Sequence, residues 1–537
     1  MQKKGAETGL SKEFKDIFEV GGVPAFNQFY YHGIFLWKSL YKGLYKPWHI
    51  INAPTIADPF GKRELFRADM AKAICAELAG LIWSEQCEVH VSQGEGEKQL
   101  LDEFIQQVLK NNNFWCKMQE HIEQAVALGG GALKTWYEDK RDDNGAIMPG
   151  RGRIKIGYAM ADQFVPTAWD NAKVTEGVFI SRQAKDGYYY TRLEWHKWHG
   201  LTYTITNEAY RADGKGGTSE GQDILGYSYP LSAVYPYIDA ETTIHGLESS
   251  LFSYYRTAIA NNIDDNSPLG VSVYANAMQT LHALDIAFDS FVREFRLGKK
   301  RIIVPAKCVR FVSDDNGRMV RYFDANDEAY EALSADDPEA LGIKDNSVEI
   351  RVDEHVAGIN ALLSILCLQV GFSTGTFTFD QAQGLKTATE IISENSKTYK
   401  TIKSHQQQIK TAIEQLVHNI IVVAGLYDLE YNGYKISALA SKDYEVKVVF
   451  DDSILQDRQT NINEGILNLT NGVMSKRKYM MDILGYTEEE AVKELETIAK
   501  ESAMTADNFD INETNKQEGN RPVGFRIDGL AVEDGGD

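Results

Sequence analysis

One long amphipathic helix constrains the fold of this chain more than any other sequence pattern. Thr387 and Glu390 form a T-x-x-E capping box at its predicted start, and the helix should end near Gly425. About 37 residues at 1.5 Å per residue span roughly 55 Å, whereas a typical globular helix has about 11–12 residues. Such a helix normally braces an extended or oligomeric body. Its predicted inward positions alternate spacings of three and four: Ile392, Asn395, Tyr399, Ile402, Gln406, Ile409, Ile413, Leu416, Ile420 and Val423.

The other patterns predict an α+β fold that is mainly helical. Ser267 and Pro268 predict the N-cap and first turn of a helix that ends near Leu297. Apolar periodicity predicts further helices over residues 64–83, 103–109, 114–128 and 353–370. Period-two patterns predict strands over residues 132–137, 153–158, 178–182, 188–195, 201–206 and 444–450, and short strands in an insert at 299–350. We expect residues 1–60 to be irregular, small helices after residue 450, and the tail from about 505 to be disordered until bound.

Composition narrows the class of protein. The 537 residues suggest several domains, and 56 Lys and Arg against 77 Asp and Glu give a net charge of −21. This balance argues against a surface that neutralises phosphates everywhere. Five scattered cysteines predict no disulfide framework, the N-terminus has no signal-peptide core, and the apolar run 420–426 is too short to span a membrane. We therefore expect a soluble intracellular protein without a membrane partner.

The motifs of common enzymes are missing from the sequence. It has no phosphate-binding GxxxxGK[ST] loop, no GxSxG and no HExxH, and Gly129–Gly131 follows a helix instead of opening one. His196 and His199 lack partners at metal-ligand spacing, so we interpret them as rings on a sheet surface. The DDNG segments at 142–145 and 314–317 are simple turns. We expect no catalytic residues, no metal and no cofactor.

Two groups of Lys and Arg residues stand out from the rest of this acidic sequence. The first lies at the end of the helix predicted to finish at Leu297. Complementing the negative end of a helix explains one or two cations, but not seven within 18 residues opposed only by Glu294. Contact with phosphate or with an acidic partner is the better interpretation. The group comprises Arg293, Arg296, Lys299, Lys300 and Arg301, with Lys307 and Arg310.

The second group of cations follows the long helix. A DNA-facing stripe and a solvated helix face paired with Glu390, Glu394 and Glu414 are equally good interpretations. This group comprises Lys386, Lys397, Lys400, Lys403 and Lys410.

An ordered set of segments resembles the portal proteins of tailed bacteriophages, of the type found in phages of Gram-positive bacteria. The most specific segments are residues 266–305 (NSPLGVSVYANAMQTLHALDIAFDSFVREFRLGKKRIIVP) and 371–409 (GFSTGTFTFDQAQGLKTATEIISENSKTYKTIKSHQQQI). The others are ALGGGALKTWYED, ADQFVPTAWDN with its EGVF continuation, the pair YYTRLEWHKW and YTITNEAY, and NEGILNLTNGVMSKRKYMMDILGYTEEEAVKELETI. The resemblance covers roughly residues 60–500.

The resemblance implies a ring, typically a dodecamer, at one vertex of the capsid. Double-stranded DNA would pass through its axial channel in packaging and ejection, without sequence preference. Implied partners are the terminase large subunit, the major capsid and scaffolding proteins, and head-completion or adaptor proteins that lead to the tail. The protein would be assembled in the host cytoplasm and reside in the virion, and it would not be an enzyme.

The resemblance also implies a division of the chain. Its parts are an unassigned N-terminal segment (1–60), an α+β wing (61–265), a stem helix (266–298), a small α/β clip (299–352), a second stem helix (353–371), a tunnel loop (372–386), a long wing helix with a strand (387–453), a helical crown (454–504) and a disordered tail (505–537).

The implied channel residues are the stem cations Arg293, Arg296, Lys299, Lys300 and Arg301, together with the tunnel loop. On its residues alone the loop fits a mobile neutral element and an ordinary connector equally well, and the resemblance favours the channel role. The candidate loop residues are Thr374, Gly375, Thr376, Phe377, Thr378, Phe379, Asp380 and Lys386.

Two rival classes remain to be compared with a portal. A nucleotide-driven DNA motor or nuclease would need a phosphate-binding loop or a dense acidic metal cluster, and the former is absent from the sequence. A structural capsid or scaffold-associated component without a DNA channel is the alternative that the sequence leaves open.

Overall fold

A computed structural model describes most of the chain. Its described residues are 28–54, 58–93, 99–142, 145–148, 151–171, 173–213, 225–298, 301–303, 310–313, 319–322, 344–346, 349–379, 388–441, 443–451, 465–484, 486 and 491–500. The chain divides into two compact units, Met1–Asp452 and Ser453–Asp537. Helix residues outnumber strand residues, as expected for a mainly helical α+β fold.

The second unit is helical where it is described. Helix α13 (Lys476–Asp482) follows Ser475, whose side-chain oxygen accepts a hydrogen bond from the Lys478 N–H as an N-cap does. Residues 465–470 and 491–500 are also helical. Thr487 and Glu490, whose T-x-x-E spacing is that of a capping box, lie outside the described residues, as does the tail from 505.

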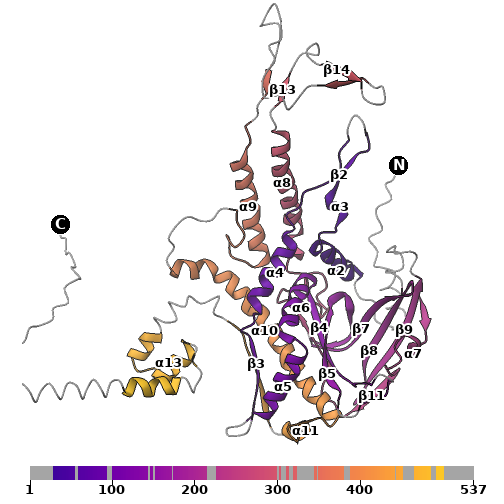
Figure 1. Ribbon diagram of the computed structural model, residues 1–537, viewed down its shortest axis with the longest axis vertical. Coiled ribbons are helices and arrows are strands. Elements are labelled where there is room, and N and C mark those ends of the chain that lie inside the picture. Colours follow the sequence, from indigo (N-terminus) through magenta and orange to yellow (C-terminus); the bar gives the residue numbers. More distant parts are fainter. Residues whose placement is uncertain are drawn as a thin grey trace, which may run out of the picture. The chain divides into compact units, whose positions relative to one another are not determined.

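The long helix exists as predicted. Helix α10 (Ala388–Leu426) has 39 residues and contacts helix α4 (Met70–Ile82) and strands β4 (Gly130–Glu138), β12 (Phe252–Arg256) and β19 (Tyr444–Val449) (Figure 1). Of its predicted inward side chains, those from Ile402 onward are buried, including Gln406, Ile413 and Val423. The capping residue Thr387 lies outside the described residues.

The segment 396–426 of α10 is also the one described helix whose length and composition would allow it to cross a membrane. Of its most apolar window, 56% is buried inside the protein. The apolar side of α10 is therefore covered by contacts with the rest of the first unit. This burial explains why the helix is apolar enough to pass the membrane criterion.

Two antiparallel sheets lie beside these helices. The three-stranded sheet has the order β12-β4-β5, with β5 at Arg153–Met160. The larger sheet has the order β10-β9-β8-β7-β6, with β11 also paired to β9. Its strands are β6 (Phe164–Asp170), β7 (Lys173–Lys185), β8 (Tyr188–His199), β9 (Thr202–Asp213), β10 (Tyr227–Tyr229) and β11 (Glu241–His245). The strands predicted over 188–195 and 201–206 are confirmed as β8 and β9, which pair as a hairpin and are longer than expected.

Apolar and ionic contacts join the two sheets. Phe164 and Phe179 from the larger sheet pack with Phe252 from the smaller one in a buried cluster. Beside them the Lys134 ammonium lies 2.6 Å from a carboxylate oxygen of Glu194. Burial lowers the pKa of Lys134, while the positive charge of Lys134 holds the pKa of Glu194 below its usual range despite burial. This buried ion pair, between β4 and β8, fixes one sheet on the other.

The interpretation of His196 as a surface ring is wrong. His196 is buried, with Nδ1 2.7 Å from the Tyr203 hydroxyl and Nε2 3.0 Å from Glu194. The reason is the strand alternation, which directs His196 toward the sheet junction and leaves His199 exposed.

Smaller elements complete the first unit. Helices α5 (Leu100–Asn111) and α6 (Phe114–Leu128) confirm the predictions over 103–109 and 114–128. Strand β19 pairs with β3 (Glu88–Gln93), and the hairpin β17 (Glu430–Tyr431) and β18 (Tyr434–Lys435) leads into α11 (Ile436–Leu439). Within the insert, β13 (Arg301–Ile303) pairs with β16 (Lys344–Asn346), and β14 (Arg310–Ser313) pairs with β15 (Met319–Tyr322). Short helices are α3 (Lys46–His49) and α7 (Leu231–Val234).

Two predictions at the N-terminal side are wrong. The helix expected over 64–83 is α4 and begins at Met70, because residues 62–64 pair as β2 (Lys62–Glu64) with β1 (Ile50–Asn52). Part of the segment expected to be irregular is helix α2 (Gln28–Tyr41). The signal for α2 was present in the sequence, since its buried aromatic and aliphatic residues recur at helical spacing: Tyr30, Tyr31, Ile34, Trp37 and Leu40.

The predicted start of a helix at Ser267 and Pro268 is also wrong. Helix α8 (Met278–Leu297) begins eleven residues later, after a 3₁₀ turn at Ala275–Ala277. The intervening residues are buried in an extended path because their backbone bonds other segments: the Thr257 hydroxyl donates to the Val271 carbonyl, and the Val273 N–H donates to the Val126 carbonyl. These long-range bonds outweigh the local helix signal. Helix α9 (Val352–Val370), by contrast, confirms the prediction over 353–370.

Two glycine backbones make that path possible. A Cβ added at Gly129 would lie 2.3 Å from the Gly270 carbonyl oxygen, and one added at Gly270 would lie 2.2 Å from the Gly129 carbonyl oxygen. Gly129 also has φ +98°, a conformation that side chains disfavour. The glycines after α6 therefore allow two backbones to touch and have no need of a ligand.

We expect Gly129→Ala to destabilise the first unit by about 3 kcal/mol or more, because the new methyl group meets the backbone of Gly270 and Val271. Gly187→Ala is the matched control: Gly187 also has positive φ, but its Cβ would meet nothing within 4 Å. The control should cost only about 1 kcal/mol. Thermal unfolding of both variants checks this, and equal destabilisation would contradict the close approach.

Candidate functional site

Helices α8 and α9 form an antiparallel pair that holds many of the candidate residues (Figure 1). The ring of Phe291 on α8 lies 6.0 Å from that of His355 on α9. At the same end, the Arg351 guanidinium lies 3.1 Å from a carboxylate oxygen of Glu294 and holds the pKa of that carboxyl below its usual value. The end of α8 is thus tied to the start of α9.

This ion pair engages the acid that would otherwise neutralise part of the basic cluster. Glu294, the one acid within the cluster, is turned toward Arg351 and His355 of α9. Arg293 and Arg296 are exposed and make no ion pair with any residue that the structure describes. Lys299, Lys300 and Lys307 lie outside the described residues, and Arg301 and Arg310 are described only as backbone positions in β13 and β14. Two of the five stem candidates are therefore placed, both on the exposed end of α8.

The loop after α9 is anchored at its start. Gly371 ends α9 with φ +89°, and the Ser373 N–H donates to the Thr398 hydroxyl of α10 at 2.8 Å. Phe372 is buried, and the half-buried Phe377 packs against it with ring centres 5.5 Å apart. In this structure Phe377 thus packs against the anchored start of the loop.

Beyond this anchor the loop is exposed. Thr374, Gly375 and Thr376 are exposed, and Gly375 has φ +92° with open space around it. Phe379 is 58% exposed, and its N–H donates to the Asn360 side chain of α9. Thr378 is exposed beside the same amide. Asp380 and Lys386 lie outside the described residues.

The lysines of α10 differ in their contacts. The Lys397 ammonium donates to the Leu368 carbonyl at the end of α9, and Lys410 pairs with Glu414 at 3.8 Å. Lys403 lies over the ring of Tyr399, and Lys400 is exposed. Lys386 lies outside the described residues. The four described lysines therefore do not form one uniform stripe.

Sequence reasoning missed a strap that holds α8. This N-terminal strap comprises residues 46–54 and 58–68 and includes α3, β1 and β2. Both guanidinium NH groups of Arg63 lie 2.6 Å from the two carboxylate oxygens of Asp289 on α8. The Phe66 N–H donates to the same carboxylate, whose side chain is 5% exposed. The bidentate pair lowers the pKa of Asp289.

A second carboxylate, one helical turn earlier, is held in the same way. Asp285 accepts from the Ala68 N–H at 2.9 Å and lies 3.1 Å from Nε2 of His49. The Trp48 ring stacks on His282 with centres 4.8 Å apart. Acids at positions 285 and 289, on one face of a largely apolar helix, are the sequence signal for this contact.

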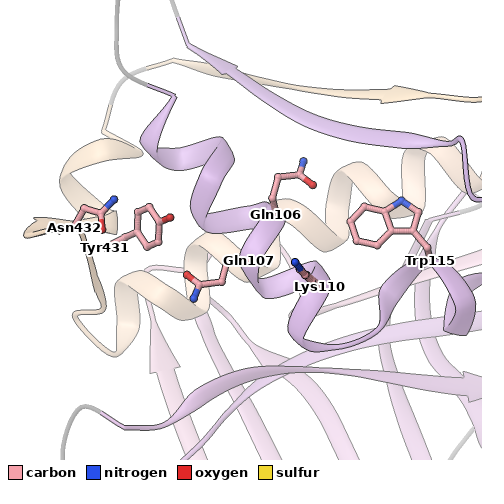
Figure 2. A pocket seen from close by; sticks show the side chains of 6 residues that line it. All are labelled: Gln106, Gln107, Lys110, Trp115, Tyr431 and Asn432. Atoms are coloured by element: carbon pink, nitrogen blue, oxygen red, sulfur yellow. The ribbon is translucent and has the colours of Figure 1, made fainter.

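One open pocket lies away from these helices. It has a volume of about 520 Å³ and is lined by Gln106, Gln107, Lys110, Trp115, Tyr431 and Asn432 (Figure 2). The Trp115 indole N–H already donates to the Cys87 carbonyl. The lining has amides and aromatic rings but no acid or imidazole, so it offers no acid–base pair. Nor do the described residues contain a group of three or more side chains that could hold a metal ion.

Together these features define a structural subunit whose paired helices carry exposed cations and apolar side chains. The sequence model described as "Phage portal protein, SPP1 Gp6-like" matches residues 30–508, so the chain belongs to this family of bacteriophage portal proteins. No curated protein matches the chain. It is a structural protein of the virion, a portal protein at the capsid vertex connected with DNA packaging, and dodecamers are typical of its family.

We expect Arg63→Gln to free the strap from α8, because it leaves the buried Asp289 carboxylate without its cation, at a cost on the order of 3 kcal/mol. The backbone amides of β1 and β2 should then exchange with solvent roughly 100-fold faster, measured by hydrogen exchange. Lys62→Gln, on the exposed side of β2, is the control and should change nothing.

The strap should also respond to acid. Because the folded state lowers the pKa of Asp289, its contribution is complete above about pH 5 and is lost as the pH falls through the folded value. The difference in strap protection between the wild type and Asp289→Asn should therefore shrink below pH 4. A constant difference down to pH 2 would contradict the ion pair.

Proposed function

We propose that the chain forms a ring that conducts double-stranded DNA into the capsid during packaging and out of it during ejection. Membership of the portal family supports this proposal. The observation that carries it is a row of exposed positions on α9 at helical spacing: Glu354, Gly358, Ala361, Ile365 and Leu368. Ile365 is 48% and Leu368 51% exposed, and the two lie together at the end of one row on α9, so they form an exposed apolar patch and not scattered single residues.

A neighbouring subunit would cover these side chains. Small residues in the first half of the row allow a close approach, and the aliphatic ones supply apolar area. On α8, Ile286 and Phe295 are 47% and 46% exposed. A ring needs a heterologous interface in which one patch of a subunit meets a different patch of the next. The row on α9 would supply one half, and an exposed apolar side chain of α8 in the next subunit would supply the other.

In this proposal α8 and α9 are the stem helices (266–298 and 353–371), residues 299–352 the clip and 372–386 the tunnel loop. The wing would comprise 61–265 and, with the long helix, 387–453, the crown 454–504, and 505–537 the tail. Arg293 and Arg296, with Lys299, Lys300 and Arg301, would face the DNA. A net charge of −21 per subunit keeps most of the surface repulsive, so that a few cations guide the polyanion without trapping it.

The proposed partners follow from this role. The clip would dock the terminase large subunit during packaging and head-completion or adaptor proteins afterwards. The wing would meet the major capsid and scaffolding proteins, and assembly would take place in the host cytoplasm. The alternative is a capsid or scaffold-associated component without a DNA channel.

Imaging of the purified protein separates the two functions. A portal gives closed rings with a central hole wide enough for duplex DNA, at a mass several times 60.3 kDa. Closed rings without such a hole, alone or with capsid and scaffolding partners present, would favour the alternative.

We expect the double variant Ile365→Ser, Leu368→Ser to shift rings toward subunits of 60.3 kDa, because it removes apolar area from the proposed contact. The matched control is Leu201→Ser, which removes an 89% exposed leucine at the turn between β8 and β9. Light scattering of both variants measures the mass, and an unchanged ring in the double variant would remove α9 from the interface.

The tunnel loop can be tested independently of assembly. Deleting residues 374–383 should leave rings intact, because the anchors at Phe372 and Ser373 stay, but should lower the amount of DNA packaged or retained. DNA content per particle is the measurement. Packaging at the wild-type level would exclude the loop from DNA handling.

A further inference from the structure

A groove on α10 has no role in the channel described above. One wall is the loop 256–260 that follows β12, and the other is the exposed side of α10. The groove has a volume of about 630 Å³ and opens to solvent. It is lined by Arg256, Thr257, Ala258, Ile259, Ala260, Lys403, Ser404, Gln407 and Gln408.

Both walls are held in place. The Ala258 N–H donates to Nδ1 of His405 at 3.3 Å, so the loop is bound directly to α10. Burial lowers the pKa of His405 to about 4, and its ring is therefore neutral and can accept this bond at neutral pH. The Thr257 N–H and hydroxyl bond the carbonyls of Gly129 and Val271. The groove is thus formed before any ligand arrives, which lowers the entropic cost of binding.

The groove is positively charged in an acidic protein. Among the residues that the structure describes, its lining contains Arg256 and Lys403 but no acid, and Lys400 is exposed one turn away. Residues 396–413 contain four lysines and no Asp or Glu, although acids exceed bases by 21 in the whole chain. Arg256 makes no ion pair with the residues that the structure describes.

The lining also has the right neutral groups for phosphate. Gln407 and Gln408 are exposed and present two amides beside the cations, while the exposed Ser404 hydroxyl donates to the Lys400 carbonyl at 2.9 Å. Arg, Lys, Ser and Gln are the side chains that contact the phosphates of DNA without reading its sequence. No aromatic residue occurs in the described part of the lining, whereas the core of a protein interface is normally enriched in aromatic side chains.

We propose that this groove binds the phosphodiester backbone of double-stranded DNA, with Arg256 and Lys403 as its two phosphate-contacting cations. This inference rests on the proposed function as a DNA conduit and adds to it a contact outside the stem and the tunnel loop.

The full-length protein should bind a fluorescent 30-base-pair duplex with an affinity that falls steeply between 50 and 200 mM salt. The double variant Arg256→Gln, Lys403→Gln removes two phosphate contacts, so its salt slope should be lower by about two and its affinity at 50 mM salt lower by roughly tenfold. Lys410→Gln, Lys435→Gln is the control of equal charge, because both lysines pair with acids outside the groove. The control should keep the wild-type slope.

Two further measurements show whether a lower salt slope comes from lost phosphate contacts or from misfolding: a charge-preserving variant, and lysine acetylation as a footprint of bound duplex on the wild type. Arg256→Lys, Lys403→Arg should retain the slope. In the wild type, bound duplex should protect Lys403 from acetylation and leave Lys410 reactive. Equal slopes in the groove and control variants, or equal protection of the two lysines, overturn the proposal.

Light scattering of the same samples separates the possible failures. Rings that form but bind no duplex overturn the groove and leave the ring in place. Loss of rings in the groove variant at unchanged DNA affinity overturns it as well, since the groove would then hold a second copy of the chain. If the wild type forms no ring yet the footprint appears, the conduit fails and the groove stands.

Discussion

Helix α10 buries a row of aliphatic side chains from Ile402 to Val423, and three other parts of the chain are placed by the need to cover it. Helix α4, strands β4 and β12, and strand β19 all contact α10. Each fully buried aliphatic side chain contributes about 1.5–3 kcal/mol, so this row outweighs any single polar contact in the molecule. The opposite side of α10 is consequently free for polar residues, and the proposed groove lies there.

The start of α8 depends on that core through two backbones in contact. Gly129 and Gly270 touch, the Tyr30 hydroxyl donates to the Gly270 carbonyl, and the Tyr274 hydroxyl donates to the Trp37 carbonyl at 2.8 Å. Aromatic residues of α2 thus fix the segment from which α8 begins. The N-terminal strap then holds α8 farther along, so that residues far away in sequence determine where the paired helices emerge.

Some charged side chains form ion pairs within the subunit, and others lie at surfaces where we propose contacts with DNA. Lys134 and Glu194 join two sheets, Arg63 and Asp289 hold the strap, and Glu294 ties α8 to α9. These pairs are internal to one subunit. Arg293 and Arg296, exposed on α8, and the cations of the proposed groove lie at the two surfaces for which we propose DNA contacts. In an acidic chain, only a few such positions attract a polyanion.

Local patterns in the sequence determined the long helix, α6, α9 and the β8–β9 hairpin, because helical periodicity and strand alternation depend on near neighbours. The order of motifs also determined the family. The tertiary structure decided where α8 begins, which lysines of α10 are already engaged, and that residues near the N-terminus brace α8. Arg63 and Asp289 are 226 positions apart, so no local pattern records their contact. Ser267 and Pro268 carry a helix-start signal, but bonds from Thr257 and Val126 hold the following residues extended. Long-range backbone bonds of this kind appear only when the chain has folded, and they decided which exposed groups remain for partners.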